Sequence, residues 1–183
     1  MFKSVFNTVA SLQKKGEILY FVLVIVLISC ASGSPKSSID SFILKHNNTS
    51  FDELKNCTIS YQGIDSRSGK LTYFIGKFNT RCSPYVLRVD KGNIQNIEID
   101  NKLVIKSCRT DYFSTRELQD IFFEYSKYDI SVLQVDSLGN VYFNPNSIDP
   151  PILLRKVSNT SPLNLNQYRL YKGNWYLRKT YFK

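Results

Sequence analysis

Four cysteines and a single histidine are the residues with which this chain could bind a metal or act as a nucleophile. Cys57, Cys82 and Cys108 are spaced by 25 and 26 residues, which matches no zinc-finger pattern, and His46 would be the only nitrogen ligand. A Cys–His protease pair has no better support, because His46 falls in a loosely patterned region. We therefore expect no catalytic residue, no metal site and no cofactor. An exported chain would instead form one disulfide among these three cysteines and keep one buried thiol.

The remaining cysteine, Cys30, follows a leader with the features of a secretory signal. Three lysines precede an apolar run from Ile18 to Ile28. As a helix this run would rise about 16 Å, against about 30 Å for the hydrocarbon core of a bilayer, so it is too short to span a membrane but fits a signal peptide. The motif Leu27-Ile28-Ser29-Cys30 then resembles the lipobox of bacterial lipoproteins.

This resemblance implies cleavage before Cys30, a diacylglyceryl group on its sulfur and an acyl chain on its new amino group. The chain would then comprise a signal peptide (1–29), a flexible tether (30–37) rich in small residues, and a single α+β domain (38–183). Ala31 stands where an Asp would keep an enteric-type lipoprotein in the inner membrane, which implies a lipid-anchored location in the bacterial cell envelope, at the outer membrane. An uncleaved signal anchor with a chance cysteine is the alternative.

The composition describes a folded, basic protein. Hydrophobic residues make up 43% and charged residues 21% of the chain, so it is neither disordered nor a polytopic membrane protein. The net charge is +9 for the full chain and +7 without residues 1–29; this charge is consistent with contact to anionic headgroups or acidic glycans, and a role in solubility is the favoured alternative. The basic residues are scattered, so we expect no nucleic-acid partner.

Helical periodicity marks two main segments. Ile39, Phe42 and Ile43 have the spacing of a short N-terminal helix, and Ser50 to Glu53 has the sequence of a capping box. A longer amphipathic helix, at about 114–128, is predicted from a second capping box and an apolar stripe, formed by Ser114, Glu117, Leu118, Ile121, Phe122 and Tyr125.

Period-two patterns predict strands along most of the remaining chain. They cover Cys57–Ile64, Leu71–Phe78, Tyr85–Asp90, Ile94–Asp100, Leu103–Cys108, Ser131–Asp136, Val141–Asn144, Ile152–Val157, Tyr168–Tyr171 and Trp175–Arg178. The predicted fold class is therefore α+β, with an antiparallel sheet of hairpins and a meander covered by one main amphipathic helix, and with a short N-terminal helix.

The order of elements over 71–146 resembles a group of small exported bacterial domains of unknown function. The resemblance is carried by an aromatic strand from Leu71, the cysteine Cys82, the strand from Tyr85, the turn at Gly92 and the following helix and strand. The second nearby cysteine and the late proline of that group are missing here. The resemblance implies the same fold class and assigns no catalytic role.

These features favour a non-enzymatic binding or assembly module held at the membrane by its lipid anchor. A protein or an anionic glycan would be its partner, and Tyr171, Trp175 and Tyr176 of the C-terminal hairpin are the candidate contact patch. One alternative is an immunity-type lipoprotein that neutralises a toxin directed at the envelope. A lesser alternative is an envelope hydrolase, which would need a pair of carboxylates brought together by folding.

Overall fold

The computed structural model describes residues 35–182, so the predicted signal peptide and Cys30 lie outside the described residues. The chain divides into two compact units, one ending at His46 and the other running from Asn47 to Lys183. No helix between residues 35 and 182 is long and apolar enough to cross a bilayer.

Helix α2 (Pro35–His46) is the described part of the first unit. Its first residue is a proline, which is favoured at that position because its fixed φ angle suits a helix and its missing N–H is not needed there. The helix therefore begins inside the segment 30–37 that was predicted to be a flexible tether.

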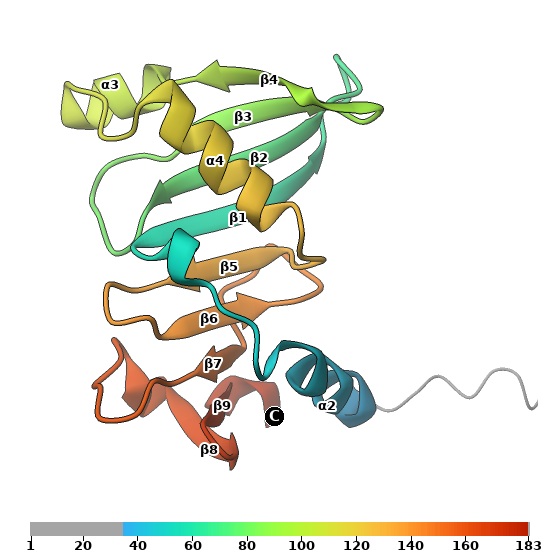
Figure 1. Cartoon of the computed structure of the whole chain (residues 1–183), viewed down its shortest axis with the longest axis vertical. Helices are drawn as coiled ribbons and strands as arrows, with labels where there is room; N and C mark the ends of the chain where they lie inside the picture. Colours follow the sequence, from blue (N-terminus) through green and yellow to red (C-terminus); the bar gives the residue numbers. More distant parts are fainter. Residues whose placement is uncertain (1–34, 183) are drawn as a thin grey trace, which may run out of the picture. The chain divides into compact units, whose positions relative to one another are not determined.

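The second unit contains a nine-stranded antiparallel sheet in the order β4-β3-β2-β1-β5-β6-β7-β9-β8 (Figure 1). This arrangement confirms the α+β class with an antiparallel sheet. The strands are β1 (Cys57–Ile64), β2 (Leu71–Lys77), β3 (Tyr85–Asp90), β4 (Asn93–Asp100), β5 (Val132–Val135), β6 (Val141–Asn144), β7 (Leu153–Arg155), β8 (Tyr168–Lys172) and β9 (Trp175–Arg178). The unit's helices are α3 (Lys102–Cys108) and α4 (Thr115–Tyr125), with the short 3-10 helices η1 (Asp52–Leu54), η2 (Leu165–Gln167) and η3 (Lys179–Phe182).

One face of the sheet carries a continuous apolar row. Residues directly opposite one another in neighbouring strands point to the same face. One such row runs from β1 to β7 and consists of Ile59, Leu133, Phe143 and Leu153, all of them fully buried. We call this side the core face and the other side the second face.

Helix α4 packs its apolar stripe against the core face of β2. The rings of Phe122 and Tyr125 lie 5.0 and 6.1 Å, between centroids, from the ring of Tyr73, and Figure 1 shows α4 crossing the strands from β1 to β4. The predicted capping box is confirmed, because Ser114 Oγ accepts from the N–H of Glu117 and the Glu117 carboxylate accepts from the N–H of Ser114. The helix ends at Tyr125, three residues earlier than predicted.

Two local predictions are wrong. The segment Leu103–Cys108 lies in helix α3, not in a strand. Val104 is its one buried residue, and Leu103 and Ile105 stay largely exposed, so a helix satisfies the single apolar contact that the segment makes. The second error is the capping box at Ser50, whose hydroxyl instead accepts from the N–H of Asp52 in a tight turn before η1.

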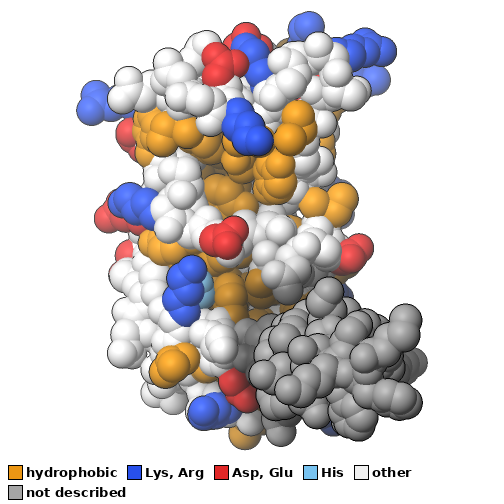
Figure 2. Space-filling model, turned by 90° about the vertical axis from the view of Figure 1, so that its right-hand side faces the viewer, with side chains coloured by type: hydrophobic (Ala, Val, Ile, Leu, Met, Phe, Trp, Pro, Cys, Tyr) orange, Lys and Arg blue, Asp and Glu red, His pale blue; other side chains and the backbone are white. Residues whose placement is uncertain are grey.

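Some apolar side chains remain on the surface, and two of them border turns of this sheet. The side of the molecule at the right of Figure 1 shows a band of hydrophobic side chains with Lys, Arg, Asp and Glu side chains around it (Figure 2). Ile64 and Ile94, which border the β1–β2 and β3–β4 turns, are about half exposed. Such scattered exposure is ordinary in a folded protein and marks no site by itself.

Candidate ligand-binding site

A row of mixed polar and aromatic residues crosses the second face where β1, β5 and β6 meet. Thr58 is directly opposite Gln134, which is directly opposite Tyr142 on its other side. These three side chains therefore point to the same face and stand next to one another. Local sequence explains their placement, because each alternates with apolar residues that point into the core face.

This row forms the floor of a hollow of about 250 Å³, which we call the second-face hollow. Its walls come from the segment after β2, the loop before η2, and the last strand. The lining residues are Thr58, Phe78, Asn79, Gln134, Tyr142, Pro151, Leu163, Asn164, Gln167, Tyr168 and Arg178.

Aromatic rings hold the floor rigid. Phe78 stacks on Tyr142 with 5.5 Å between ring centroids, and Tyr168 meets Tyr142 edge to face at 6.2 Å. The hydroxyls of Tyr142 and Tyr168 donate to main-chain carbonyls, at 3.2 and 3.0 Å respectively. Burial raises the pKa of both tyrosines, so both hydroxyls stay protonated near neutral pH and keep these bonds.

Arg178 supplies a positive charge on a guanidinium group whose orientation is fixed by its contacts. Its Nη2 donates to Gln167 Oε1 at 2.7 Å and its Nη1 donates to the carbonyl of Pro151 at 3.3 Å. The guanidinium carbon also lies 5.9 Å from the centroid of the Tyr168 ring. A planar group held in this way can present its charge to a carboxylate in one defined orientation.

Thr58 and Gln134 retain unused hydrogen-bonding capacity. Both are half-buried, and neither side chain makes a hydrogen bond to any other residue in the described range 38–181. A buried amide or hydroxyl group is nearly always paired with protein or with ordered water. A ligand that offers both donors and acceptors can therefore bind here by replacing water.

The predicted contact patch is not a single surface. Trp175 is 1% exposed, stacks on Phe143 with 5.4 Å between centroids, and donates from Nε1 to Asn47 Oδ1 at 3.0 Å. Tyr176 follows it in the strand, points to the second face, and packs on the cluster of Tyr142 and Tyr168. Trp175 and Tyr176 lie on opposite faces of the sheet, because neighbouring residues in a strand face opposite ways.

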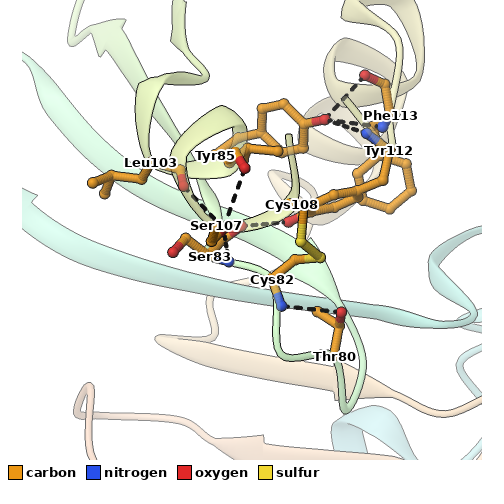
Figure 3. Close-up of a disulfide and its surroundings, with 10 residues drawn as sticks. Thr80, Cys82, Ser83, Tyr85, Leu103, Ser107, Cys108, Tyr112 and Phe113 are labelled. Carbon is orange, nitrogen blue, oxygen red and sulfur yellow. Dashed lines mark hydrogen bonds between the residues drawn. A yellow bond between two sulfur atoms is a disulfide. The ribbon is translucent and has the colours of Figure 1, made fainter. Parts of the chain in front are cut away.

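Two of the three cysteines in the described part of the chain are bonded to each other. Cys82, just before β3, forms a disulfide with Cys108 at the end of α3 (Figure 3). Nearby, the buried Tyr85 hydroxyl accepts from the N–H groups of Tyr112 and Phe113, at 2.8 and 3.0 Å. Cys57 is buried and not disulfide-bonded, and burial raises the pKa of its thiol to about 11, so at neutral pH it is a poor nucleophile.

No group of three or more His, Cys, Asp or Glu side chains among the described residues is placed to hold a metal ion. His46, the only nitrogen ligand considered, ends α2, where its ring lies 4.5 Å from that of Phe42.

The sequence did not single out the residues of the second-face hollow. Thr58 and Gln134 are polar residues inside predicted strands, which normally indicates no more than a solvated face. These residues could be recognised only by noting that neighbouring strands place polar and aromatic side chains on the same face of the sheet. That pattern requires the strand order, which the sequence alone does not give.

Comparisons of the chain with protein-family models, with curated proteins and with solved structures found no match.

Proposed function

We propose that this chain is a non-enzymatic, lipid-anchored binding module of the bacterial envelope whose second-face hollow binds a sugar unit of a glycan. The observation that carries the proposal is the pair Thr58 and Gln134, half-buried beside fixed aromatic rings and with hydrogen-bonding capacity unused within the described residues.

Sugars have the chemistry that this lining recognises. Their hydroxyls both donate and accept, and the Gln134 amide and the Thr58 hydroxyl can meet both demands. The C–H groups of a sugar ring pack on aromatic rings, whose faces carry partial negative charge, and Phe78, which is half-buried and backed by the buried Tyr142, supplies such a ring. The volume of about 250 Å³ is just below the usual range of pockets for drug-sized ligands, about 300–1,000 Å³, and suits a ligand as small as one sugar unit.

The positive charge of Arg178 favours acidic sugars over neutral sugars as ligands of the second-face hollow. Arg178 lines the hollow and can pair with a carboxylate in two parallel hydrogen bonds. Residues 1–29 carry three lysines and one glutamate, so the proposed mature chain keeps a net charge of +7, which would draw an anionic glycan toward the protein.

The proposal also gives the two faces different roles. Helix α4, which contacts β2 through Phe122 and Tyr125, would act as the cover of the core face. The second face would then be the one presented to ligands.

The anchor is tested independently of the ligand. Replacing the proposed lipidated residue, Cys30→Ser, should move the protein from the membrane fraction to the soluble fraction in bacterial cells. Mass spectrometry of the native protein should find a chain that begins at an acylated residue 30. An intact leader with an unmodified thiol would contradict the anchor and leave the ligand proposal standing.

Saturation-transfer NMR tests the ligand. Glucuronic acid and N-acetylmuramic acid should give signals from the ring protons, and glucose should bind more weakly because it lacks the carboxylate. Gln134→Ala should weaken binding by about 3- to 10-fold, the effect of one or two neutral hydrogen bonds. Gln95→Ala is the matched control, because Gln95 is an exposed glutamine of the same sheet on the edge strand β4. Equal binding by both variants, or no signal from any sugar, would refute the proposal.

A further inference from the structure

A second, larger hollow of about 530 Å³ lies on the core-face side of β7, beyond the reach of the sugar site. We call it the Arg155 hollow. Three parts of the second unit enclose it: the segment Asn47–Asp52 with Lys55, the β5–β6 turn at Leu138 and Gly139, and the segment that leaves β7, Arg155–Ser158, with Asn174 beside it.

Arg155 gives this hollow a fixed planar cation. Its guanidinium carbon lies 5.1 Å from the ring centroid of Phe51 and 5.9 Å from that of Trp175. Nη1 donates to the carbonyl of Thr49 at 2.7 Å and to that of Asn47 at 3.4 Å. Burial lowers the pKa of Arg155, yet a guanidinium stays charged in proteins. The Arg155 guanidinium is therefore always charged, and these contacts hold its plane in one orientation.

Two lysines extend the positive charge. Lys55 Nζ pairs with Asp52 at 2.7 Å, and this pairing lowers the pKa of the Asp52 carboxyl, which is ionised at neutral pH. Lys156 makes no ion pair with any described residue, and its Nζ lies 3.5 Å from the carbonyl of Val157. The charged side chains of the lining are thus three cations and one carboxylate, with a net charge of +2.

The rim of the hollow is apolar. Leu138 and Val157 line it and are 56% and 41% exposed. Gly139 lies between the positive and apolar parts: a Cβ atom built there would be 3.5 Å from Lys55 Cε and 3.6 Å from Val157 Cγ2. Its φ of +84° also favours glycine, so the turn brings these two side chains close without obstructing the hollow.

We propose that the Arg155 hollow is a second ligand site, specific for a phosphate group attached to a larger body. Arg155 would supply the planar fork that matches phosphate oxygens, and Lys156 would add a flexible point charge. The apolar rim would contact the body that carries the phosphate. A free phosphate ester and the headgroup of an anionic lipid share this chemistry.

Lysine footprinting tests the site on the full chain. The protein is placed in bilayer nanodiscs of a neutral, phosphate-free lipid, digalactosyldiacylglycerol, and acetylated slowly, and the rate at each lysine is read by mass spectrometry. Glycerol 3-phosphate and inorganic phosphate are the free probes, and discs containing phosphatidylglycerol present the lipid headgroup. Acetylation of Lys156 should slow with phosphate bound, whereas Lys91, exposed in the β3–β4 turn, should react at an unchanged rate.

The variants separate a specific site from general attraction of anions. With phosphate binding read in both variants from the protection of Lys55, which also lines the hollow, Lys156→Gln should weaken binding by about 10-fold, the loss of one charge-assisted hydrogen bond, while Lys91→Gln should leave it unchanged. Protection of Lys156 in neutral discs by the free probes would identify a soluble phosphate ligand, and protection only in phosphatidylglycerol discs would identify a lipid headgroup. No selective protection of Lys156 under either condition, or equal effects of the two variants, would overturn the proposal. The NMR experiment with sugars tests the second-face hollow, which lies on the opposite face of the sheet from the Arg155 hollow. The sugar proposal and the phosphate proposal can therefore fail independently.

Discussion

Removing the disulfide Cys82–Cys108 should destabilise the protein mainly through its unfolded state. The bond closes a loop with a sequence separation of 26 that contains β3, β4 and α3. In the chain-entropy relation, opening a loop of this length returns about 12 cal/mol/K to the unfolded chain, or about 3.5 kcal/mol at 25 °C. This is a large part of the 5–15 kcal/mol typical of folded domains.

The native contacts around α3 should survive this change. Val104 is fully buried, and Ser107 Oγ accepts from the N–H of Ser83 at 2.8 Å while it donates to the carbonyl of Leu103 (Figure 3). The Cys82→Ala, Cys108→Ala double variant should therefore keep its circular dichroism spectrum. In urea, its free energy of unfolding should fall by about 3.5 kcal/mol.

Reductant supplies the internal control. Dithiothreitol should lower the unfolding midpoint of the wild-type protein to that of the double variant and leave the variant unchanged. If the variant unfolds at the same urea concentration as the oxidised wild type, the bond does not constrain the unfolded chain and the reasoning fails. If the variant loses helical signal before unfolding, α3 depends on the bond in the native state, contrary to the prediction.

Three further predictions concern single side chains. Tyr85→Phe should lower the free energy of unfolding by about 1–3 kcal/mol, measured by urea titration, because two main-chain N–H groups lose their acceptor in a mostly buried place. The Cys57 thiol, whose pKa is about 11, should react with iodoacetamide at pH 8 only as fast as the protein opens, so that urea accelerates the reaction; rapid labelling of the native protein would contradict its burial. The hydrogen bonds from Ser114 lower the pKa of Glu117 below 4.5 in the folded protein. The ionised carboxylate therefore stabilises the fold fully above pH 4.5, and this contribution is lost as the pH falls through the folded-state pKa. Glu117→Gln should reduce the loss of stability on acidification, and an unchanged acid dependence would contradict the prediction.

Sequence patterns identified most of the elements because their signals are local. The capping box of Ser114 and Glu117 and the turns of the hairpins depend on residues within a few positions of one another. The strand predicted at Leu103–Cys108 failed for a non-local reason. Val104 and Ile105 favour a strand by their β-branched side chains, but the disulfide and the Ser107–Ser83 hydrogen bond tie the segment back toward the start of β3.

The two candidate sites could not be predicted from the sequence because they too depend on contacts between residues far apart in the chain. Thr58 and Gln134 become neighbours only because β1 pairs with β5, and Arg155 acquires its surroundings from Thr49 and Phe51, far away in the chain. Trp175 is buried, and it shows that a large aromatic residue near a turn can belong to a core as readily as to an interface.

The pairing of β1 with β5 has a consequence for the order of events during folding. It comprises four residue pairs, from Cys57 opposite Val135 to Ser60 opposite Val132, and it joins strands separated by three other strands and two helices. The adjacent hairpins can assemble early, whereas this seam must wait for a long loop to close, which is slow. Because Thr58 and Gln134 stand on either side of the seam, a partly assembled chain has no second-face hollow. A ligand bound there would contact strands on both sides of the β1–β5 pairing. Because it would bind only the assembled sheet, its binding would raise the free energy of unfolding of the whole sheet.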